Sequence, residues 1–365
     1  MTPQTVISET PLPPATALCE EVVNENLLKG LPVNEEDYAI IVGVSHYMSL
    51  APLNGPITDA CRLKNWLIKA DGGNIHPQHV FFIPSAPGSQ TPDQMSIDKA
   101  LSDILQMAAA KPARRLYFYF SGHGFGSNWE VNGMCLPIWS PSFYNAALSS
   151  KAYLDLLVEK DLFQEVYFFL DCCRDKKINT KPLHSMLGGA RPGGANTMAV
   201  LLYASEYENA AWEGMMNTDG SLQVHGYFSR ALMEALNGGA VNNNGDITIT
   251  SFIDYIREKT ESYAQERNQT QTVRSDIRNN KYGMNYVIHR TGRIPGTVLT
   301  ITFKTAGEIS LDGPDLHNIK SGPVQAGESW LVPLGKGYHQ LTNKTTKTSA
   351  FITIDGTLKT MQYDF

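Results

Sequence analysis

The sequence has no surplus of positive charge and no clustered basic run. It contains 30 Lys and Arg against 36 Asp and Glu, which gives a formal net charge of -6. Proteins that bind nucleic acids neutralise the phosphates with clustered Lys and Arg side chains. We therefore predict that nucleic acid is not a partner of this chain.

Long hydrophobic runs are also missing. The longest apolar runs fall well short of the roughly 20 residues that a helix needs to cross a bilayer. The first 21 residues, MTPQTVISETPLPPATALCEE, have neither a basic head nor an apolar core. We expect no membrane attachment and no standard secretion signal. Residues 1–35, rich in Pro, Thr and Glu, are predicted to form a flexible N-terminal arm.

Cysteine is scarce and irregularly spaced. The odd number of five cysteines matches neither a disulfide framework nor a zinc site; they are Cys19, Cys61, Cys135, Cys172 and Cys173. Such usage favours a reducing compartment. We therefore predict a cytoplasmic location.

Short apolar segments alternate with segments of helical periodicity in the first half of the chain. We expect buried strands at 38–45, 79–85, 114–121 and 165–173, and helices at 57–70, 96–110 and 149–161. This alternation is typical of a parallel α/β sheet with helices on both faces.

The second half of the chain changes character twice. Residues 174–196 are dense in Gly, Pro and Lys and are predicted to be an exposed loop. A strand is expected at 197–205 and helices at 227–240 and 246–268. Short β-like segments without a helical stripe then predict a separate small antiparallel β domain over residues 291–365.

Two of the predicted strands end in reactive residues. The stretch YFYFSGHGFG places His123 between two glycines after one strand, and FLDCCRD places Cys172 and Cys173 at the end of the next. Ligands bind at the carboxyl ends of strands in open parallel sheets, and a cysteine needs a base or an imidazolium neighbour to become a thiolate. A catalytic His–Cys dyad is therefore predicted, although His123 alone would equally fit a turn in which it bonds local carbonyls.

The spacing and neighbours of these residues resemble those of caspase-like cysteine peptidases. Cys173 follows His123 by 50 residues, which is the separation typical of caspases. The Asp-x-Cys sequence that ends at Cys173 is similar to that of metacaspases and bacterial caspase-like proteases. The resemblance runs from residue 38 to about residue 265, through YAIIVGVSHY, LNGPITDACRLKNWL, LLYASEYENAAWEG, GYFSRALMEAL and GDITITSFIDYI.

This resemblance, to the peptidase C14 type, implies the fold and the domain boundaries. It implies a caspase-like, mostly parallel sheet with helices on both faces, followed by the small β domain. The peptidase domain would cover residues 36–290, divided into a large-subunit-like part (36–175), a connector (176–196) and a small-subunit-like part (197–290).

The resemblance also implies roles for single residues. Cys173 matches the nucleophile and His123 the general base or acid, while the N–H groups of Gly124 and Cys173 would form the oxyanion hole. Cys172 is interpreted as a small buried hydrophobe. Arg174 stands where metacaspases have a histidine, and their calcium-binding carboxylates have no match here. The sequence thus predicts no cofactor or metal and leaves a calcium requirement undecided.

A specificity pocket follows from the same resemblance. Asp171 stands where metacaspases hold a pocket carboxylate, which implies cleavage after Arg or Lys. By the same resemblance, Glu213 would join it as a second pocket acid, with a solvated loop glutamate as the alternative. The segment around Ser205, YASEY, is expected to bind an extended peptide along its edge. The alternative, an ordinary buried strand, stays open for the half that contains Leu201.

The expected function is that of a cysteine endopeptidase acting on protein or peptide substrates. The family resemblance suggests latency until a small-molecule or protein activator arrives, with a role in bacterial antiviral defence or programmed cell death. Self-cleavage in the connector is a hypothesis for Lys176, Lys177, Lys181 and Arg191, against a plain surface loop. The alternative function is an inactive caspase-like scaffold or ligand-sensing module. Six further histidines are predicted to have no functional partner: His46, His76, His79, His184, His225 and His289.

Overall fold

A computed structural model describes most of the chain, in two compact units. The described residues are 19, 22–174, 181–188, 196–218, 221–242, 245–290, 297–314, 316, 318–335, 337–354 and 360–365. One unit comprises Met1–Met233 and Ile253–Gly283, and the other comprises Glu234–Phe252 and Met284–Phe365. The predicted domain boundaries at residues 35, 175, 196 and 290 remain proposals.

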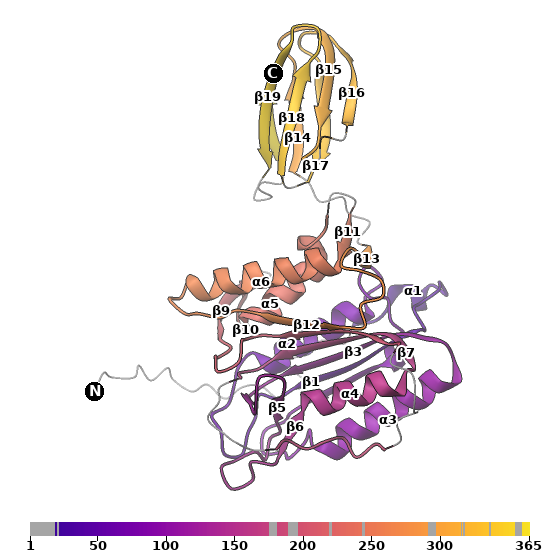
Figure 1. Cartoon of the computed structure of the whole chain (residues 1–365), viewed down its shortest axis with the longest axis vertical. Coiled ribbons are helices and arrows are strands. Elements are labelled where there is room, and N and C mark those ends of the chain that lie inside the picture. The colour runs from indigo at the N-terminus through magenta and orange to yellow at the C-terminus, as the bar shows by residue number, and fades with distance from the viewer. Residues whose placement is uncertain are drawn as a thin grey trace, which may run out of the picture. The chain divides into compact units, whose positions relative to one another are not determined.

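The first unit is built on a six-stranded sheet in the order β12-β8-β7-β3-β1-β2 (Figure 1). All neighbours in it are parallel except β12, which runs antiparallel to β8. The strands are β1 Asp37–Gly43, β2 Val80–Pro84, β3 Ala113–Ser121, β7 Phe163–Asp171, β8 Met198–Tyr203 and β12 Arg274–Arg278. The predicted α/β class with a mostly parallel sheet is confirmed.

Helices cover both faces of this sheet, which is why the central parts of its inner strands, residues 38–43, 116–120 and 166–170, are apolar and buried. On one face, Phe118 and Phe120 of β3 join a core with Leu101 of α3 and Leu154 of α4. Figure 1 shows α5 on the opposite face, where Tyr119 of β3 bonds Ser229 at 2.6 Å. The helices are α1 Glu25–Leu28, α2 Pro56–Ile68, α3 Gln94–Ala110, α4 Ser150–Lys160, α5 Tyr227–Glu234 and α6 Ile249–Gln265, with short turns η2 Pro77–His79 and η3 Ala235–Gly239.

Two smaller sheets of the first unit lie outside the sequence prediction. One has the order β4-β5-β6, and the other is the antiparallel hairpin β10-β9. Their strands are β4 Gly124–Gly126, β5 Asn132–Cys135, β6 Ala147–Ser149, β9 Glu213–Thr218 and β10 Ser221–Gly226. These strands are short and contain several glycines, so they lack the apolar alternation by which a strand is predicted.

The end of the predicted N-terminal arm is packed against the first unit. Asn24 is fully buried and donates from Nδ2 to the carbonyl of Ile68 at 2.7 Å. Cys19 forms a disulfide with Cys61 of α2, 42 residues away, although the cysteine spacing predicts no disulfide. Only the folding of the arm onto α2 brings these two cysteines together. Disulfides are typical of oxidising compartments, so this bond does not favour the predicted cytoplasmic location.

The described part of the connector, residues 181–188, is also bonded to the first unit. Leu183 donates to the carbonyl of Ala147 at 2.7 Å. The buried carboxylate of Asp98 in α3 accepts from Ser185 Oγ at 2.7 Å and from the Met186 N–H at 2.8 Å. These residues are therefore anchored, whereas the sequence predicts an exposed loop throughout.

The second unit contains two sheets that enclose a separate core. Their orders are β17-β14-β20 and β16-β15-β18-β19. The strands are β14 Thr297–Thr302, β15 Gly307–Asp312, β16 Asn318–Val324, β17 Ser329–Leu334, β18 Gly337–Asn343, β19 Thr348–Ile354 and β20 Thr360–Asp364, and this unit also holds the pair β11 Asp246–Thr248 and β13 Val287–Arg290. Leu299, Leu311 and Leu341 are among its fully buried residues. The small β domain is confirmed, except that β14 and β20 are parallel.

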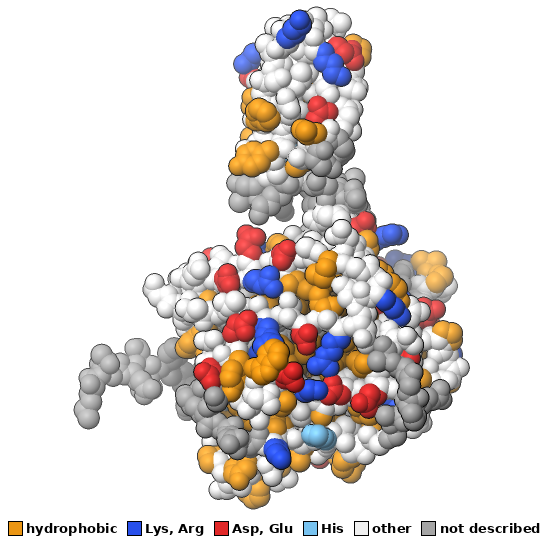
Figure 2. All heavy atoms as spheres, viewed as in Figure 1, with side chains coloured by type: hydrophobic (Ala, Val, Ile, Leu, Met, Phe, Trp, Pro, Cys, Tyr) orange, Lys and Arg blue, Asp and Glu red, His pale blue; other side chains and the backbone are white. Residues whose placement is uncertain are grey.

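The described part of the chain shows no basic patch in the view of Figure 2 and contains no helix suited to cross a membrane. Basic and acidic side chains are interspersed on the face that Figure 2 presents. Within the described residues, no helix combines the length and apolar character needed to cross a membrane. The absence of a nucleic-acid or membrane partner stays a prediction.

Candidate active site

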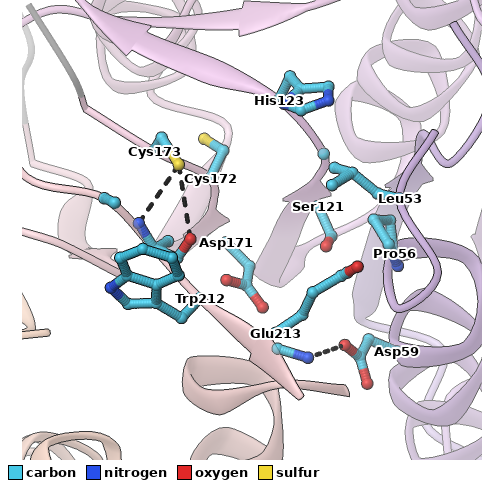
Figure 3. A pocket seen from close by; sticks show the side chains of 14 residues that line it. Leu53, Pro56, Asp59, Ser121, His123, Asp171, Cys172, Cys173, Trp212 and Glu213 are labelled. Atoms are coloured by element: carbon cyan, nitrogen blue, oxygen red, sulfur yellow. Dashed lines mark hydrogen bonds between the residues drawn. The ribbon is translucent and has the colours of Figure 1, made fainter. Parts of the chain in front are cut away.

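His123 and Cys173 line one pocket of about 280 Å³ in the first unit. Strands β3 and β7 are parallel neighbours, and Ser121 of β3 pairs with Asp171 of β7. Each reactive residue therefore follows its strand by two positions at the same level of the sheet. Figure 3 shows the His123 ring and the two cysteine sulfur atoms at one end of the pocket, and acidic side chains at the other.

The imidazole of His123 has a defined orientation. Its Nε2 lies 2.9 Å from the carbonyl oxygen of Ala51. Because a carbonyl only accepts, Nε2 carries the proton of the neutral ring and Nδ1 keeps a lone pair. Burial lowers the pKa of His123, which favours this neutral form at pH 7.

Tyr47 supports the loop that carries His123. Its hydroxyl oxygen accepts a hydrogen bond from the His123 backbone N–H at 2.7 Å, and the two rings lie 4.7 Å apart between centroids. A Cβ on Gly122 would stand 2.5 Å from the Tyr47 hydroxyl. Glycine at position 122 therefore permits the close approach of Tyr47, a residue that the sequence analysis did not single out.

The two adjacent cysteines have different surroundings. Cys172 is buried within the core, its Sγ accepts from Asn132 Nδ2 at 3.2 Å, and burial raises its pKa far above the ordinary value. Cys173 reaches the pocket, where its Sγ accepts from the Ala211 N–H at 3.3 Å and donates to the Ala211 carbonyl at 3.5 Å. The two positions agree with a buried hydrophobe followed by an accessible thiol.

Gly124 packs tightly against both cysteines. A Cβ there would stand 2.8 Å from the Cys173 carbonyl oxygen and 2.9 Å from Cys172 Sγ. His123 accepts a ladder bond from the Cys135 N–H at 3.0 Å. Since bonded and non-bonded pairs alternate in an antiparallel ladder, the Gly124 N–H points away from β5. That N–H is thus outside the β4-β5 ladder.

Three acidic residues line the other end of the pocket: Asp59, Asp171 and Glu213. Asp171 is 6% exposed and accepts from Ser229 Oγ at 2.5 Å. Burial, together with the nearby Asp59 carboxylate, raises the pKa of Asp171 to about 7. Asp59 was missed in the sequence analysis because nothing in its helical stripe connects it with Asp171.

Glu213 anchors the hairpin to the start of α2. Its two carboxylate oxygens accept from the backbone N–H groups of Asn54 and Gly55, each at 3.0 Å. Free N–H groups at a helix start favour a negative charge. The Glu213 carboxylate therefore already has two backbone partners. It is neither an unpaired acid in the pocket nor a solvated glutamate on a loop.

The segment expected to bind an extended peptide is not a free edge. Strand β8, which includes Leu201, lies between β7 and β12, so both of its edges are paired. The prediction of a free strand edge at YASEY is wrong, because Tyr203 ends β8 and pairs with Arg274 of β12, while residues 204–207 are not in a strand. The alternative, an ordinary buried strand, holds for residues 201–203. Ser205 is fully buried, donates to the Asn209 carbonyl at 3.1 Å and is not among the pocket residues.

Arg174, the residue after Cys173, is buried among aromatic rings. Its guanidinium lies 4.1 Å from the Tyr203 ring centroid, and its Nη2 donates to the Trp129 carbonyl at 2.5 Å. Its backbone N–H donates to the Asn209 carbonyl at 3.0 Å, and its carbonyl accepts from Glu208. These bonds hold residues 208–209 beside the chain that carries Cys173.

The remaining predicted residues lie apart from the pocket or outside the described chain. Lys181 is exposed, and Lys176, Lys177 and Arg191 are outside the described residues. The described residues include no group of three or more His, Cys, Asp and Glu placed to hold a metal ion. His225, predicted to have no functional partner, is bonded to Asp59 at 2.6 Å.

Comparison with known proteins gives a family and several distant relatives. The model of the caspase domain family, peptidase C14, matches residues 36–282. A probable protease from a Desulfuromonadales bacterium is 25% identical over an alignment of 152 residues that covers 38% of this chain and 18% of that protein. The chain therefore matches less than a fifth of the length of this relative.

Two solved structures have similar but distant folds. A Geobacter sulfurreducens protein is 14% identical with a TM-score of 0.45, over 71% of this chain and 99% of that one. Caspase-1 from Spodoptera frugiperda is 15% identical with a TM-score of 0.42, over 67% of this chain and 89% of that one.

Proposed function

The chain belongs to the caspase domain family of peptidases, and from this membership we propose that it is a cysteine endopeptidase. Cys173 is the nucleophile and His123 the general base. The observation that carries the proposal is the parallel register of Ser121 with Asp171, which brings both reactive residues into one pocket. Thiol-dependent peptide hydrolysis needs at least a thiol nucleophile and a histidine base that face the same pocket.

The orientation of His123 supports a specific order of proton transfers. The Ala51 carbonyl holds the Nε2 proton, so Nδ1 takes the proton of the Cys173 thiol. The thiolate attacks the carbonyl carbon of the scissile bond, and the leaving amine receives the proton from His123. Water then hydrolyses the thioester. The Gly124 N–H, which lies outside the β4-β5 ladder, and the Cys173 N–H stabilise the oxyanion.

The acidic end of the pocket supports cleavage after Arg or Lys. The Asp171 carboxylate accepts hydrogen bonds from the hydroxyl and the backbone N–H of Ser229. It has no cationic partner among the interactions described, so it is the carboxylate to meet a basic side chain. A charged hydrogen bond in a buried site is stronger than a neutral one. Glu213, bonded to two backbone N–H groups, positions the hairpin rather than the substrate.

The contacts of Cys173 support the proposal of latency. The Ala211 N–H and carbonyl both bond its sulfur, so Ala211 has to move before His123 and a substrate reach the sulfur together. An activator that displaces this segment would switch the enzyme on. The role in bacterial antiviral defence or cell death is proposed on the family resemblance alone.

The test compares the wild type with the C173A variant on peptides that end in Arg, Lys or Asp. We expect wild-type cleavage after Arg and Lys, none after Asp, and none by C173A. Tyr144, half-exposed and away from the pocket residues, gives a control in Y144F. A wild type that cleaves no peptide, even after limited proteolysis to release the Ala211 segment, would support the inactive scaffold instead.

A further inference from the structure

A buried histidine lies behind the acidic end of the pocket and has no part in the proposed mechanism. His225 is the last residue but one of strand β10, before Gly226, and is 0% exposed. Its Nδ1 lies 2.6 Å from Oδ1 of Asp59, which is 1% exposed and stands in the first turn of α2. The pair joins two elements that are 166 residues apart in the sequence.

The surroundings of the ring assign its proton. Nδ1 faces a carboxylate oxygen and therefore donates, whereas Nε2 is buried without a hydrogen-bond partner among the described residues. A buried N–H without an acceptor is rarer in proteins than an under-used acceptor. The geometry therefore fits a neutral imidazole protonated on Nδ1 and an ionised Asp59, so the pair carries one negative charge.

Gly226 brings this charge close to Asp171. Its N–H donates to Asp59 Oδ2 at 2.8 Å, and a Cβ on the same residue would overlap Asp171 Oδ2. Gly226 is thus in contact with the carboxylates of both Asp59 and Asp171. Any residue with a Cβ at this position would clash with Asp171. Figure 3 shows the bond to Asp59 beside the pocket.

We propose that His225 is a positioning residue that sets substrate specificity: it holds Asp59 as an oriented carboxylate, so that Asp59 and Asp171 together bind the guanidinium of a substrate arginine. A guanidinium has five N–H donors in one plane and can bond two carboxylates at once. This inference rests on the proposed peptidase function and assigns the substrate class of its pocket.

The test uses two nearly isosteric variants, H225N and H225L. The amide nitrogen of Asn occupies a place close to that of Nδ1 and can donate to Asp59, whereas Leu cannot. Without this donor, Asp59 keeps the bond from the Gly226 N–H to Oδ2 but loses the bond that orients Oδ1. Each variant is measured on one peptide with Arg before the scissile bond and on the same peptide with citrulline, the uncharged isostere of Arg.

We expect KM for the Arg peptide to rise about tenfold in H225L, the effect of about 1.4 kcal/mol of lost interaction. The kcat of that variant and its KM for the citrulline peptide should change less than about twofold. H225N should restore most of the Arg preference. D59N should raise KM for the Arg peptide as H225L does, and the double variant D59N/H225L should show no further rise in KM. An unchanged ratio of Arg to citrulline KM in H225L, or a parallel loss for both peptides, would overturn the proposal.

A binding measurement separates this inference from the peptidase proposal. Calorimetry with N-acetyl-arginine amide on full-length C173A, with and without H225L, reports the pocket charge without catalysis. A chain that cleaves nothing yet binds this ligand in a His225-dependent way would retain the specificity role and refute the peptidase. A chain that cleaves after Arg but binds the ligand equally in both backgrounds would retain the peptidase and refute the role of His225.

Discussion

Asp171 is buried at the end of β7, where its pKa of about 7 makes the charge of the pocket depend on pH. The cause is first the loss of water around the carboxylate and then the repulsion from Asp59. An acid with a raised pKa takes up its proton as the pH falls through 7. The pocket therefore becomes less negative in mildly acidic solution, where Lys and Arg keep their charge.

We predict that KM for an Arg peptide rises about tenfold per pH unit below about pH 7, as one ionisation requires. Steady-state kinetics between about pH 5.5 and about pH 8 test this, with the citrulline peptide as the control for changes elsewhere. In D171N the KM for Arg should be high at every pH. A wild-type KM that stays flat across this range would show that Asp171 does not contact the substrate cation.

The local sequence around the site explains which residues were predictable. His123 and Cys173 each follow an apolar strand directly, so the strand pattern and the parallel topology suffice to place them together. Tyr47, Asp59 and His225 act through partners that are distant in the sequence. No local pattern distinguishes such residues from ordinary loop, helix and strand residues.

At the scale of elements, the connector offers four basic residues for self-cleavage, and two of them precede proline. Lys181 is followed by Pro182 and Arg191 by Pro192. A proline nitrogen has no N–H to donate, and its ring restricts both its own backbone and that of the residue before it. These two bonds are therefore poor candidates for cleavage in an extended substrate.

We predict that any self-cleavage occurs after Lys176 or Lys177. Intact-mass measurement of the purified, activated chain should show two fragments, the second of which begins at residue 177 or 178. The double variant K176A/K177A should stay whole, whereas K181A should be cut as the wild type is, and C173A excludes a contaminating protease. Fragments that begin at Pro182 or Pro192 would contradict the proline argument.

Elements differ in how well the sequence predicted them. The inner strands of the central sheet have apolar, buried central parts, because helices cover both faces. Strand β12, RSDIR, stands at the sheet edge and has half-buried side chains throughout, so its polar sequence is typical of a loop. Because β12 was not predicted, the sequence did not show that Tyr203, the first residue of YASEY, is paired on both sides.

At the scale of the whole molecule, two separate hydrophobic cores predict two unfolding events. The core with Phe118 and Leu154 belongs to the first unit, and the core with Leu299 and Leu341 to the second. We predict that L341A, which removes a fully buried side chain, costs about 2–5 kcal/mol. Calorimetry should show one transition at lower temperature and the other unchanged, with peptide cleavage retained.

The matched control for L341A lies in the same sheet. Phe351 of β19 is 69% exposed, so F351A should leave both transitions in place. A single transition that shifts as a whole in L341A would show instead that the two units unfold as one cooperative body.

The sequence by itself determined the α/β class, the separate β domain, and the strand ends that carry His123 and Cys173. These features follow from local apolar periodicity and from the general geometry of parallel sheets. Only the tertiary structure decided the disulfide of Cys19 with Cys61, the inner position of β8, and the pairing of Asp59 with His225. Each of these joins segments far apart in the chain, and such pairings depend on how the packed elements meet, which local residue patterns do not encode.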